Sequence, residues 1–341
     1  MFVVLQTAFL GDTILTTPLI EYLAARGPVH VVATPAGASL LANNPGVASL
    51  IVYDKRGADA GVSGLRRVAA RVRATGAQTA YIAQGSLRTA ALALVAGVRE
   101  RVGFSSSPGR VLYTRRVAFR RDLHHAQRLL MLARAPGLVP PALAVRPSLF
   151  PGDREEAEVD ALLHSHGVTQ AEPLVALAPG SVWATKRWPS YDALAQRLAE
   201  IPAMHGARVT IIGGAAAAPL ATAISKALAV MGAAPAVDAT GHLSLLASAA
   251  LIGRARVLVT NDSAPLHMAS AMNTPTIAIY GPTVPAFGFG PLAEVHAVIG
   301  HEGLACRPCD AHGPKRCPLG HWRCMRELEP ERVAAAVEAM M

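Results

Sequence analysis

Short apolar strands and amphipathic helices alternate along this chain in two successive series, and this alternation most constrains its fold. In the first series the expected strands span residues 3–6, 29–34, 50–53 and 79–83, and the expected helices span 12–26, 64–75 and 88–95. Strands that alternate with helices predict a parallel sheet joined by crossover helices. Asp12 is well placed to cap the first helix, because its side chain can accept a hydrogen bond from a free backbone N–H.

A proline-rich segment, residues 136–151, interrupts the alternation, because repeated proline prevents regular hydrogen bonding in helices and strands. In the second series the expected strands span 174–178, 208–212, a short run near 237, 257–260 and 276–280, and the expected helices span 154–166, 190–200, 219–230, 244–253 and 265–272. We therefore expect two Rossmann-like α/β domains, residues 1–150 and 151–328, followed by a terminal helix at 329–341.

The positive charge of the chain is confined to its first half. The formal net charge is +9, but residues 1–150 hold 18 Lys and Arg against 6 Asp and Glu, whereas residues 151–341 hold 14 against 17. One arginine cluster spans residues 66–73, and a looser one spans 99–128. Two interpretations are open: a solvated arginine-rich surface, or a face that binds phosphate or carboxylate groups, which match the guanidinium fork.

Several classes of protein are disfavoured by the sequence. No apolar run reaches the roughly 18 to 20 residues needed to cross a bilayer, since Arg254 and Arg256 interrupt the longest candidate. The N-terminus lacks a basic n-region and has Asp12 where a signal peptide would continue its apolar core, so we expect a cytoplasmic protein. All four cysteines fall within residues 306–324, unlike the wider spread that is typical of a disulfide-stapled secreted protein.

Four segments carry chemistry, and each follows an expected strand, where open α/β sheets bind their ligands. The first is Phe9–Thr13, in which Gly11 permits close backbone approach and Asp12 is either a general base or an ordinary helix cap. The second, Leu177–Pro189, gathers hydroxyl groups, backbone N–H groups and Lys186 before a helix. It suits a diphosphate, and the alternative is an exposed basic loop anchored by a tryptophan.

The third segment, Val259–His267, leaves a strand and opens a helix. The free backbone N–H groups in residues 263–266 are expected to face outward at the positive end of the helix dipole and to form an anion site. Asp262 beside them could bind sugar hydroxyls, whereas His267 is either part of this site or a structural histidine. The fourth segment, Tyr280–Thr283, is a Gly-Pro turn at the next strand end.

None of these segments has the GxGxxG fingerprint of dinucleotide-binding domains or the GxxxxGK[ST] pattern of a P-loop. The pair Gly213-Gly214 follows another strand but is too short a signal for either motif. The missing fingerprint weakens the case for a Rossmann dehydrogenase.

Taken in order, the four segments resemble the heptosyltransferase family of lipopolysaccharide core synthesis, glycosyltransferase family nine. The resemblance extends over nearly the whole chain, in the stretches LGDTILTTPL, GSVWATKRWP, SLLASAALIGRARVLVTNDSAPLHMASAMNTPTIAIYGPT and CRPCDAHGPKRCPLGHWRCM. It implies a GT-B fold, in which two Rossmann-like domains face each other across a cleft. The N-terminal domain would bind the acceptor and the C-terminal domain would bind ADP-heptose, in an inverting reaction that requires no cofactor.

The resemblance also assigns roles to individual residues. It makes the carboxylate of Asp12, beside Gly11, the general base that acts on the acceptor hydroxyl. Lys186 would contact the donor phosphates and stabilise the departing ADP together with a helix N-terminus. The other implied donor-binding residues are Ser181, Leu243 against adenine, Asp262 at the heptose, and Ser263, Ala264 and His267 around the diphosphate.

The expected acceptor explains the charge of the first half. A Kdo-lipid A type acceptor carries phosphates and carboxylates and lies in an anionic membrane, so we expect it to contact Arg66, Arg67, Arg120 and Arg121. Gly11, beside the base, is also expected to contact this acceptor. The enzyme would then be peripheral on the inner face of the inner membrane. One departure from the family concerns the donor: an acidic residue often follows the Gly-Gly pair, but here residues 215–218 are all alanine, which leaves another nucleotide sugar open.

The cysteines Cys306, Cys309, Cys317 and Cys324 offer enough soft ligands for a tetrahedral structural zinc site. Their spacing departs from the usual two-knuckle pattern, and free buried thiols or a disulfide are the alternatives. A rival class is a basic, zinc-containing nucleic-acid-binding protein. Only 5% of the residues are aromatic and no known reader motif is present, so we expect no nucleic-acid partner.

Overall fold

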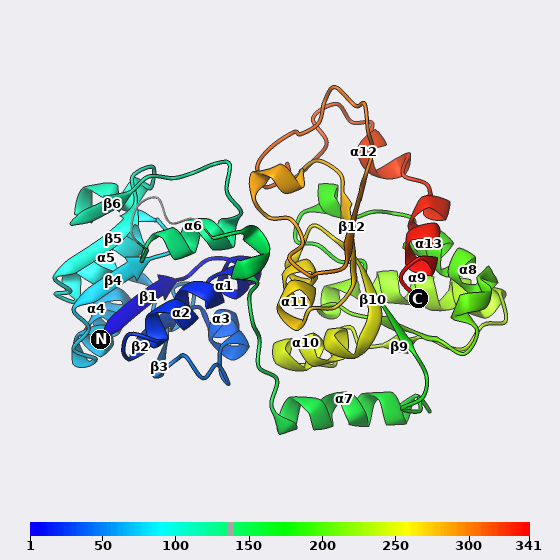
Figure 1. Cartoon of the computed structure of the whole chain (residues 1–341), viewed down its shortest axis with the longest axis horizontal. Helices are drawn as coiled ribbons and strands as arrows, with labels where there is room; N and C mark the ends of the chain where they lie inside the picture. Colours follow the sequence, from blue (N-terminus) through cyan, green and yellow to red (C-terminus); the bar gives the residue numbers. More distant parts are fainter. Residues whose placement is uncertain (135–139) are drawn as a thin grey trace. The chain divides into compact units, whose positions relative to one another are not determined.

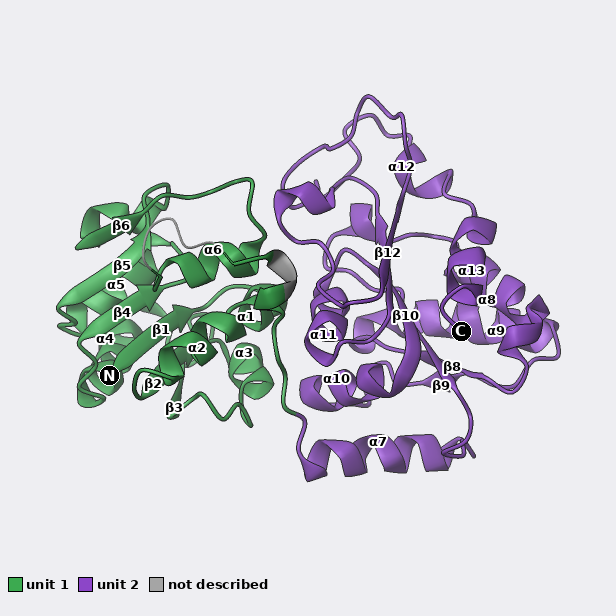
Figure 2. Ribbon diagram, in the orientation of Figure 1, with its two compact units in different colours: residues 1–150 green, residues 151–341 purple. Residues whose placement is uncertain are grey.

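The computed structural model describes residues 1–134 and 140–341, and each half of the chain forms an α/β fold around a parallel six-stranded sheet (Figure 1). The chain divides into two compact units, unit 1 (residues 1–150) and unit 2 (residues 151–341) (Figure 2). The proline-rich segment expected as a linker falls partly on residues 135–139, which lie outside the described residues.

Unit 1 has the strand order β3-β2-β1-β4-β5-β6. Its strands are β1 (Phe2–Gln6), β2 (Val29–Ala33), β3 (Ser49–Val52), β4 (Thr79–Ile82), β5 (Glu100–Phe104) and β6 (Arg115–Val117). Its helices are α1 (Leu10–Leu15), α2 (Thr17–Ala24), α3 (Pro35–Leu40), α4 (Gly61–Ala74), α5 (Leu87–Val95) and α6 (His125–Met131), with short 3-10 helices η1 (Pro108–Leu112) and η2 (Ala142–Val145). Helices α4 and α5 pack with η1 on one face of the sheet, and α1, α2, α3 and α6 cover the other.

The strands and helices expected in the first half are present, with two differences in the first helix. The expected helix at 12–26 is two helices, since Pro18 lacks a backbone N–H and the chain starts a new helix at Thr17. The N-cap of α1 is Phe9, so Asp12 lies inside the first turn and the capping prediction is wrong. Sequence reasoning missed β5 and β6, in which charged residues hide the apolar alternation.

Unit 2 has the strand order β12-β11-β10-β7-β8-β9. Its strands are β7 (Leu174–Ala178), β8 (Arg208–Ile211), β9 (Val237–Asp238), β10 (Ala255–Asn261), β11 (Thr276–Tyr280) and β12 (His296–Gly300). Its helices are α7 (Asp153–Ser165), α8 (Tyr191–Glu200), α9 (Ala218–Val230), α10 (Leu245–Arg254), α11 (Ala264–Met272), α12 (Arg323–Arg326) and α13 (Pro330–Glu338), with 3-10 helices η3 (Ala184–Lys186), η4 (Pro202–Met204), η5 (Ala215–Ala217) and η6 (Pro285–Phe287). The terminal helix α13 packs on α8 and belongs to unit 2.

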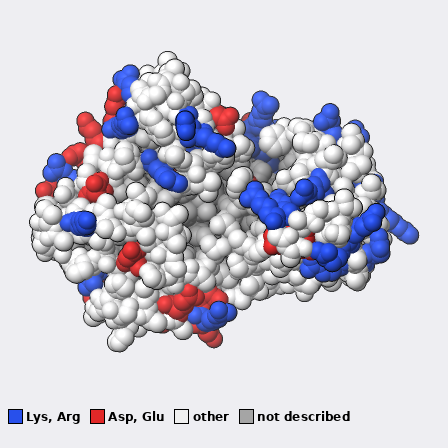
Figure 3. Space-filling model, turned by 180° about the vertical axis from the view of Figure 1, so that it is seen from behind, with Lys and Arg blue, Asp and Glu red and all other residues white. Residues whose placement is uncertain are grey.

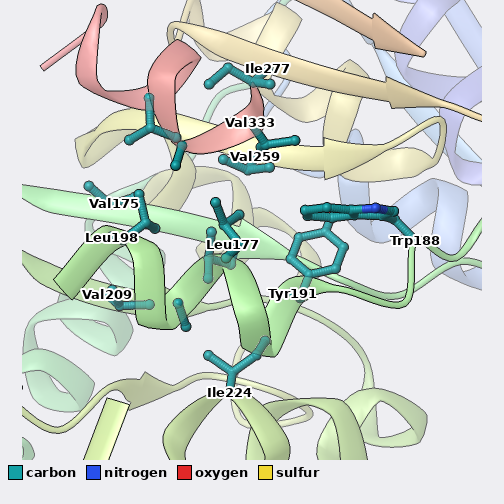
Figure 4. Close-up of a cluster of buried hydrophobic side chains, with 14 of the residues drawn as sticks. Val175, Leu177, Trp188, Tyr191, Leu198, Val209, Ile224, Val259, Ile277 and Val333 are labelled. Atoms are coloured by element: carbon teal, nitrogen blue, oxygen red, sulfur yellow. The ribbon is translucent and has the colours of Figure 1, made fainter. Parts of the chain in front are cut away.

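The core of unit 2 extends to the segment that follows β7. Trp188 is 2% exposed, and its ring lies 5.2 Å from the ring of Tyr191 (Figure 4). Side chains of five strands, among them Leu177 and Val259, belong to the same buried cluster. Burying a side chain as large as tryptophan contributes about 2 to 3 kcal/mol, so this cluster holds the loop before α8 in place. Within the described residues, none of the helices has the length and apolar character to cross a bilayer.

A tight contact fixes the start of α4 in unit 1. The side chain of Asp59 is largely buried and accepts hydrogen bonds from Arg67 and Arg71 of α4. Gly64, in the first turns of the helix, lies directly against the backbone of Asp59, and a Cβ at this position would overlap the Asp59 carbonyl group. The glycine is therefore required by close packing.

We expect Gly64→Ala to lower the free energy of unfolding by about 1 to 3 kcal/mol, because overpacking outweighs the helix propensity of alanine. Ala70→Gly, at an exposed position of the same helix, is the matched control and should cost about 1 kcal/mol through propensity alone. Urea unfolding followed by circular dichroism measures both changes. A Gly64→Ala protein that is more stable than the wild type would contradict the packing argument.

Candidate active site

The strand ends of unit 2 bring together a buried lysine, a carboxylate and a hydroxyl. The Nζ atom of Lys186 lies 2.6 Å from Oδ2 of Asp262, and the two side chains are only 11% and 9% exposed. The Oγ1 atom of Thr283 donates a second hydrogen bond to the same carboxylate oxygen, at 2.7 Å. The second, third and fourth segments of the sequence analysis therefore meet at one point.

The loop that carries Lys186 is fixed by hydrogen bonds to the neighbouring strand. The backbone N–H of Trp188 donates to Oδ1 of Asn261, and Nδ2 of Asn261 donates to the carbonyl of Pro179. The indole N–H of Trp188 donates to the carbonyl of Leu328. The loop between β7 and α8 is thus held at both ends, and the Lys186 ammonium group is pre-positioned.

Helix α11 begins directly after Asp262, with Ser263 as its N-cap. The Oγ atom of Ser263 is buried and has no hydrogen-bond partner among the residues that the structure describes. Pro265 has no N–H group and the N–H of Leu266 bonds to the Ser263 carbonyl, so the free N–H groups are fewer than expected from the sequence. Ser263 and Ala264 remain as the hydrogen-bond donors that suit an anion at this helix start.

The other residues expected to bind the donor take less central positions. His267 is buried one turn into α11, with its ring 6.3 Å from that of Phe289. Ser181 lies in the loop after β7, where its hydroxyl accepts a hydrogen bond from the Trp183 N–H. Leu243 is half-buried just before α10. Their contact with a donor stays a prediction.

The cysteine-rich segment, residues 306–324, packs against the residues around Lys186, and sequence reasoning missed this role. The N–H of Cys309 donates to the carbonyl of Pro282, and the hydroxyl of Thr185 donates to the carbonyl of Pro314. The guanidinium of Arg307 donates to four backbone carbonyls at the ends of β11 and β12, those of Tyr280, Gly281, Thr283 and His301. Arg307 therefore connects this segment to the turn that carries Thr283.

The zinc site considered for the four cysteines is not assembled in the structure. All four are free thiols, and across residues 1–134 and 140–341 no three His, Cys, Asp or Glu side chains are placed to hold a metal ion. Cys309 donates its thiol to the carbonyl of Cys306, and Cys324 is buried on α12. These positions match the alternative of thiols in a packed loop.

The base expected in unit 1 has a partner that the sequence did not suggest. Asp12 follows β1 in the first turn of α1, and its Oδ1 atom lies 3.5 Å from Nε2 of His125, the first residue of α6. Both side chains are mostly buried. Thr16 and Gln6 donate to the backbone carbonyl of Asp12 and fix the turn. His125 is one of twelve histidines, and no spacing in the sequence marks it.

Three further cations gather at the strand ends of unit 1. The Nζ atom of Lys55 donates to the carbonyl of Thr7, directly after β1, at 2.5 Å. Burial, with repulsion from Arg56 and Arg88, lowers the pKa of Lys55. Cations that repel one another at a protein surface favour an anionic ligand, which relieves the repulsion. Sequence reasoning missed this group because Arg88 is distant from the other two along the chain.

The arginines expected to bind the acceptor fall into two groups. Arg66 and Arg67 lie on α4, on the opposite face of the sheet from α1, and Arg67 is engaged with Asp59. Arg120 pairs with Asp122, and hydrogen bonds from Arg120 hold the pKa of that carboxyl at about 2. Arg121 is exposed four residues before His125. The Arg120–Arg121 segment is therefore the better placed of the two with respect to Asp12.

Two Rossmann-like units, one with a helix start beside a buried lysine and the other with a carboxylate after its first strand, match the GT-B arrangement that the sequence implies. The family model for glycosyltransferase family 9 (heptosyltransferase) matches residues 65–322, and the chain belongs to this family. Asp12 and Lys55 precede the matched range.

Individual relatives agree with this assignment. The lipopolysaccharide heptosyltransferase 2 of Escherichia coli K12 is 24% identical over 352 residues, which cover 99% of this chain and 97% of that protein. The crystal structure of a family 9 glycosyltransferase from Veillonella parvula is similar with a TM-score of 0.84 at 24% identity, over 99% of this chain and 96% of that one. The E. coli ADP-heptose lps heptosyltransferase II has a TM-score of 0.79 at 24% identity, over 99% and 98%. The GT-B fold is thereby established, and the chain is most similar to heptosyltransferases of the second type.

The cysteines should differ in reactivity according to their surroundings. Burial and the neighbouring thiols raise the pKa of Cys324 to about 11. Slight burial acts to raise the pKa of Cys317, but backbone hydrogen bonds from residues 319–322 outweigh it and lower the pKa. Because the thiolate is the nucleophile, iodoacetamide at pH 8 should alkylate Cys317 first and Cys324 last. Peptide mass spectrometry over time measures the order, and faster labelling of Cys324 would contradict the structure.

Proposed function

We propose that this protein moves heptose from ADP-L-glycero-D-manno-heptose to the Kdo/heptose inner core of a lipid A precursor, with inversion at the anomeric carbon. Membership of glycosyltransferase family 9 and the names of its relatives support heptosyl transfer in lipopolysaccharide biosynthesis. The observation that carries the donor assignment is the buried contact between Lys186 and Asp262, next to the helix start at Ser263.

In the proposed donor site, different groups contact the diphosphate and the sugar. A diphosphate at the start of α11 would meet the Lys186 ammonium, the Ser263 hydroxyl and the free N–H groups of the first turn. These groups stabilise the negative charge that develops on the departing ADP, so no metal ion is needed for this step. Asp262 keeps Lys186 in place and has a second oxygen that can accept hydrogen bonds from the sugar hydroxyls.

The acceptor site supplies the base. Asp12 would take the proton from the attacking acceptor hydroxyl as the new glycosidic bond forms, and the glycosidic bond to ADP breaks. A single carboxylate is sufficient for this transfer, unlike the carboxylate pairs of glycoside hydrolysis. His125 contacts the carboxylate and holds it in one orientation, so we assign His125 as a positioning residue for the base.

The charge of unit 1 suits an anionic acceptor. Lys55, Arg56 and Arg88 lie at the strand ends on which Asp12 also lies, and they favour phosphate or carboxylate groups of a Kdo-lipid A type molecule. Arg120 and Arg121 would extend this region, whereas Arg66 and Arg67 would contribute to it only through the overall field. We propose a cytoplasmic enzyme that is peripheral on the inner face of the inner membrane.

A second candidate donor, another nucleotide sugar, is favoured by one observation. Ala215 and Ala216 are exposed after β8, at the position where family members often carry an acidic residue. An alanine cannot accept a hydrogen bond from a sugar hydroxyl, so this chain has one contact fewer with which to select heptose.

Turnover with ADP-heptose and either Kdo-lipid A or heptosyl-Kdo-lipid A tests the proposed function, with UDP-glucose and ADP-glucose as competing donors. We expect transfer from ADP-heptose alone.

Lys186→Met should weaken ADP binding at least tenfold, since a charge-assisted hydrogen bond contributes about 1.5 to 3 kcal/mol. Isothermal titration calorimetry measures the affinity for ADP, and Lys226→Met, at an exposed position of α9, is the control. An unchanged affinity in Lys186→Met would refute the phosphate assignment.

Asp12→Asn should lower kcat by a factor of about 10² to 10⁴ while donor affinity is unchanged, because it removes the base alone. Asp153→Asn, in the first turn of α7, is the matched control.

His125→Asn should lower kcat about tenfold with little change in KM. If His125 acts through Asp12, the double variant is no slower than Asp12→Asn. Near-normal turnover in Asp12→Asn would refute the base assignment. A double variant whose loss of kcat equals the product of the two single losses would refute the role of His125.

A further inference from the structure

Helix α5 presents an apolar stripe to solvent. Leu87, Leu94 and Val95 are 54%, 44% and 40% exposed, and Ala91 between them is half-exposed. Residues seven or eight positions apart lie on one side of an α-helix, two turns from each other. The inward side of the same helix, with Leu92 and its neighbours, is fully buried in the unit 1 core. The exposed stripe is therefore a second apolar side that the fold does not use.

The short helix η1 extends this surface. The N–H of Gly109 donates to the carbonyl of Gly85, just before α5, and a Cβ at Gly109 would lie 2.7 Å from Cβ of Ala90. η1 therefore lies directly against α5. Its Val111 is 67% exposed, which makes it one of the most exposed large apolar residues of unit 1. Four aliphatic side chains from two adjacent elements thus face water.

The surroundings of this patch are positively charged. Residues 61–121 contain twelve arginines, no lysine and a single acidic residue, Glu100, which is paired with Arg115. Arg110 is exposed within η1, and Arg99 and Arg116 are exposed a few residues beyond α5 and η1 in the sequence. Arg73 of α4 donates to the carbonyl of Val95 at the end of α5. Figure 3 views the molecule from behind, and on unit 1, at the right, blue side chains far outnumber red ones.

We propose that α5 and η1 form a docking surface for an anionic lipid bilayer, a proposal that deepens the proposed function by assigning the surface through which the enzyme reaches a lipid-linked acceptor. Aliphatic side chains enter the boundary between headgroups and acyl chains, while arginines around them bind lipid phosphates. The uniform positive charge complements an anionic leaflet.

The position of α5 relative to the base supports this assignment. The hydroxyl of Thr89, in the first turn of α5, lies 3.3 Å from the hydroxyl of Thr7, which directly follows β1. Phe9, two residues further along and at the N-cap of the helix that carries Asp12, is 58% exposed. The apolar surface therefore begins at the same sheet edge as the acceptor base. A sugar on a lipid anchor could reach this edge while its acyl chains stay in the bilayer.

Vesicle flotation with purified protein tests the proposal. Vesicles of phosphatidylethanolamine and phosphatidylglycerol carry negative charge, and phosphatidylcholine vesicles are the neutral comparison. We expect binding to the anionic vesicles only, weaker at high salt. The triple variant Leu94→Ser/Val95→Ser/Val111→Ser should bind at least tenfold more weakly, because each substitution removes aliphatic groups from the bilayer.

A charge variant and a matched control complete the experiment. Arg99→Glu/Arg110→Glu/Arg116→Glu should also lose at least tenfold in vesicle affinity. Val230→Ser/Val295→Ser, which alters exposed aliphatic residues of unit 2, should bind like the wild type. All variants change exposed side chains, and an unaltered unfolding midpoint confirms that each is folded. Transfer to an acceptor without acyl chains should stay at the wild-type rate in the apolar triple variant and in the unit 2 control.

Three results would overturn the assignment: no vesicle binding by the wild type, equal binding to neutral vesicles, or undiminished binding by the apolar triple variant. The vesicles contain no sugar acceptor, so these outcomes do not depend on the reaction. If vesicle binding behaves as expected and ADP-heptose is not used, the proposed function fails and the docking surface stands.

Discussion

All strands in both sheets run parallel, and this constraint determines where the chain can place chemistry. Parallel strands end at one edge, and each connection must leave that edge through a loop and return through a crossover helix. The loops after β7, β10 and β11 are therefore neighbours although about a hundred residues separate the first from the last. Lys186, Asp262 and Thr283 meet because each lies in the connection that follows one of these strands.

The meeting of Lys186 and Asp262 removes two charges from water, which is unfavourable unless their geometry is good. The short contact and the additional hydrogen bond from Thr283 compensate for the desolvation. Breaking such a pair by removing one partner typically costs about 3 to 5 kcal/mol. The cysteine-rich segment adds to this arrangement, because Arg307 bonds to the carbonyl of Thr283 and Gly313 packs on the Lys186 side chain. The Lys186–Asp262 pair is thus held from two directions.

The sequence was sufficient to predict the alternating architecture, because the spacing of apolar residues and the residue types that form turns are local properties of the chain. It also marked Lys186, Asp262 and Ser263 as candidate site residues, because their segments follow clearly apolar strands, and the structure brings Lys186 and Asp262 into contact. It could not locate His125, which reaches Asp12 only through the packing of α6 beside α1. Nor could it separate Arg67, which is bound to Asp59, from Arg121, which is exposed, because the partners of a charged side chain depend on the tertiary fold.

The burial of Trp188 beside Lys186 also has an optical consequence. The chain has only three tryptophans, and all belong to unit 2: Trp183 and Trp188 flank Lys186, and Trp322 lies in the cysteine-rich segment, two residues before Cys324. Unit 1 contributes no indole to the emission spectrum. The intrinsic tryptophan fluorescence of this protein therefore comes from unit 2 alone, the unit that contains the Lys186–Asp262 pair.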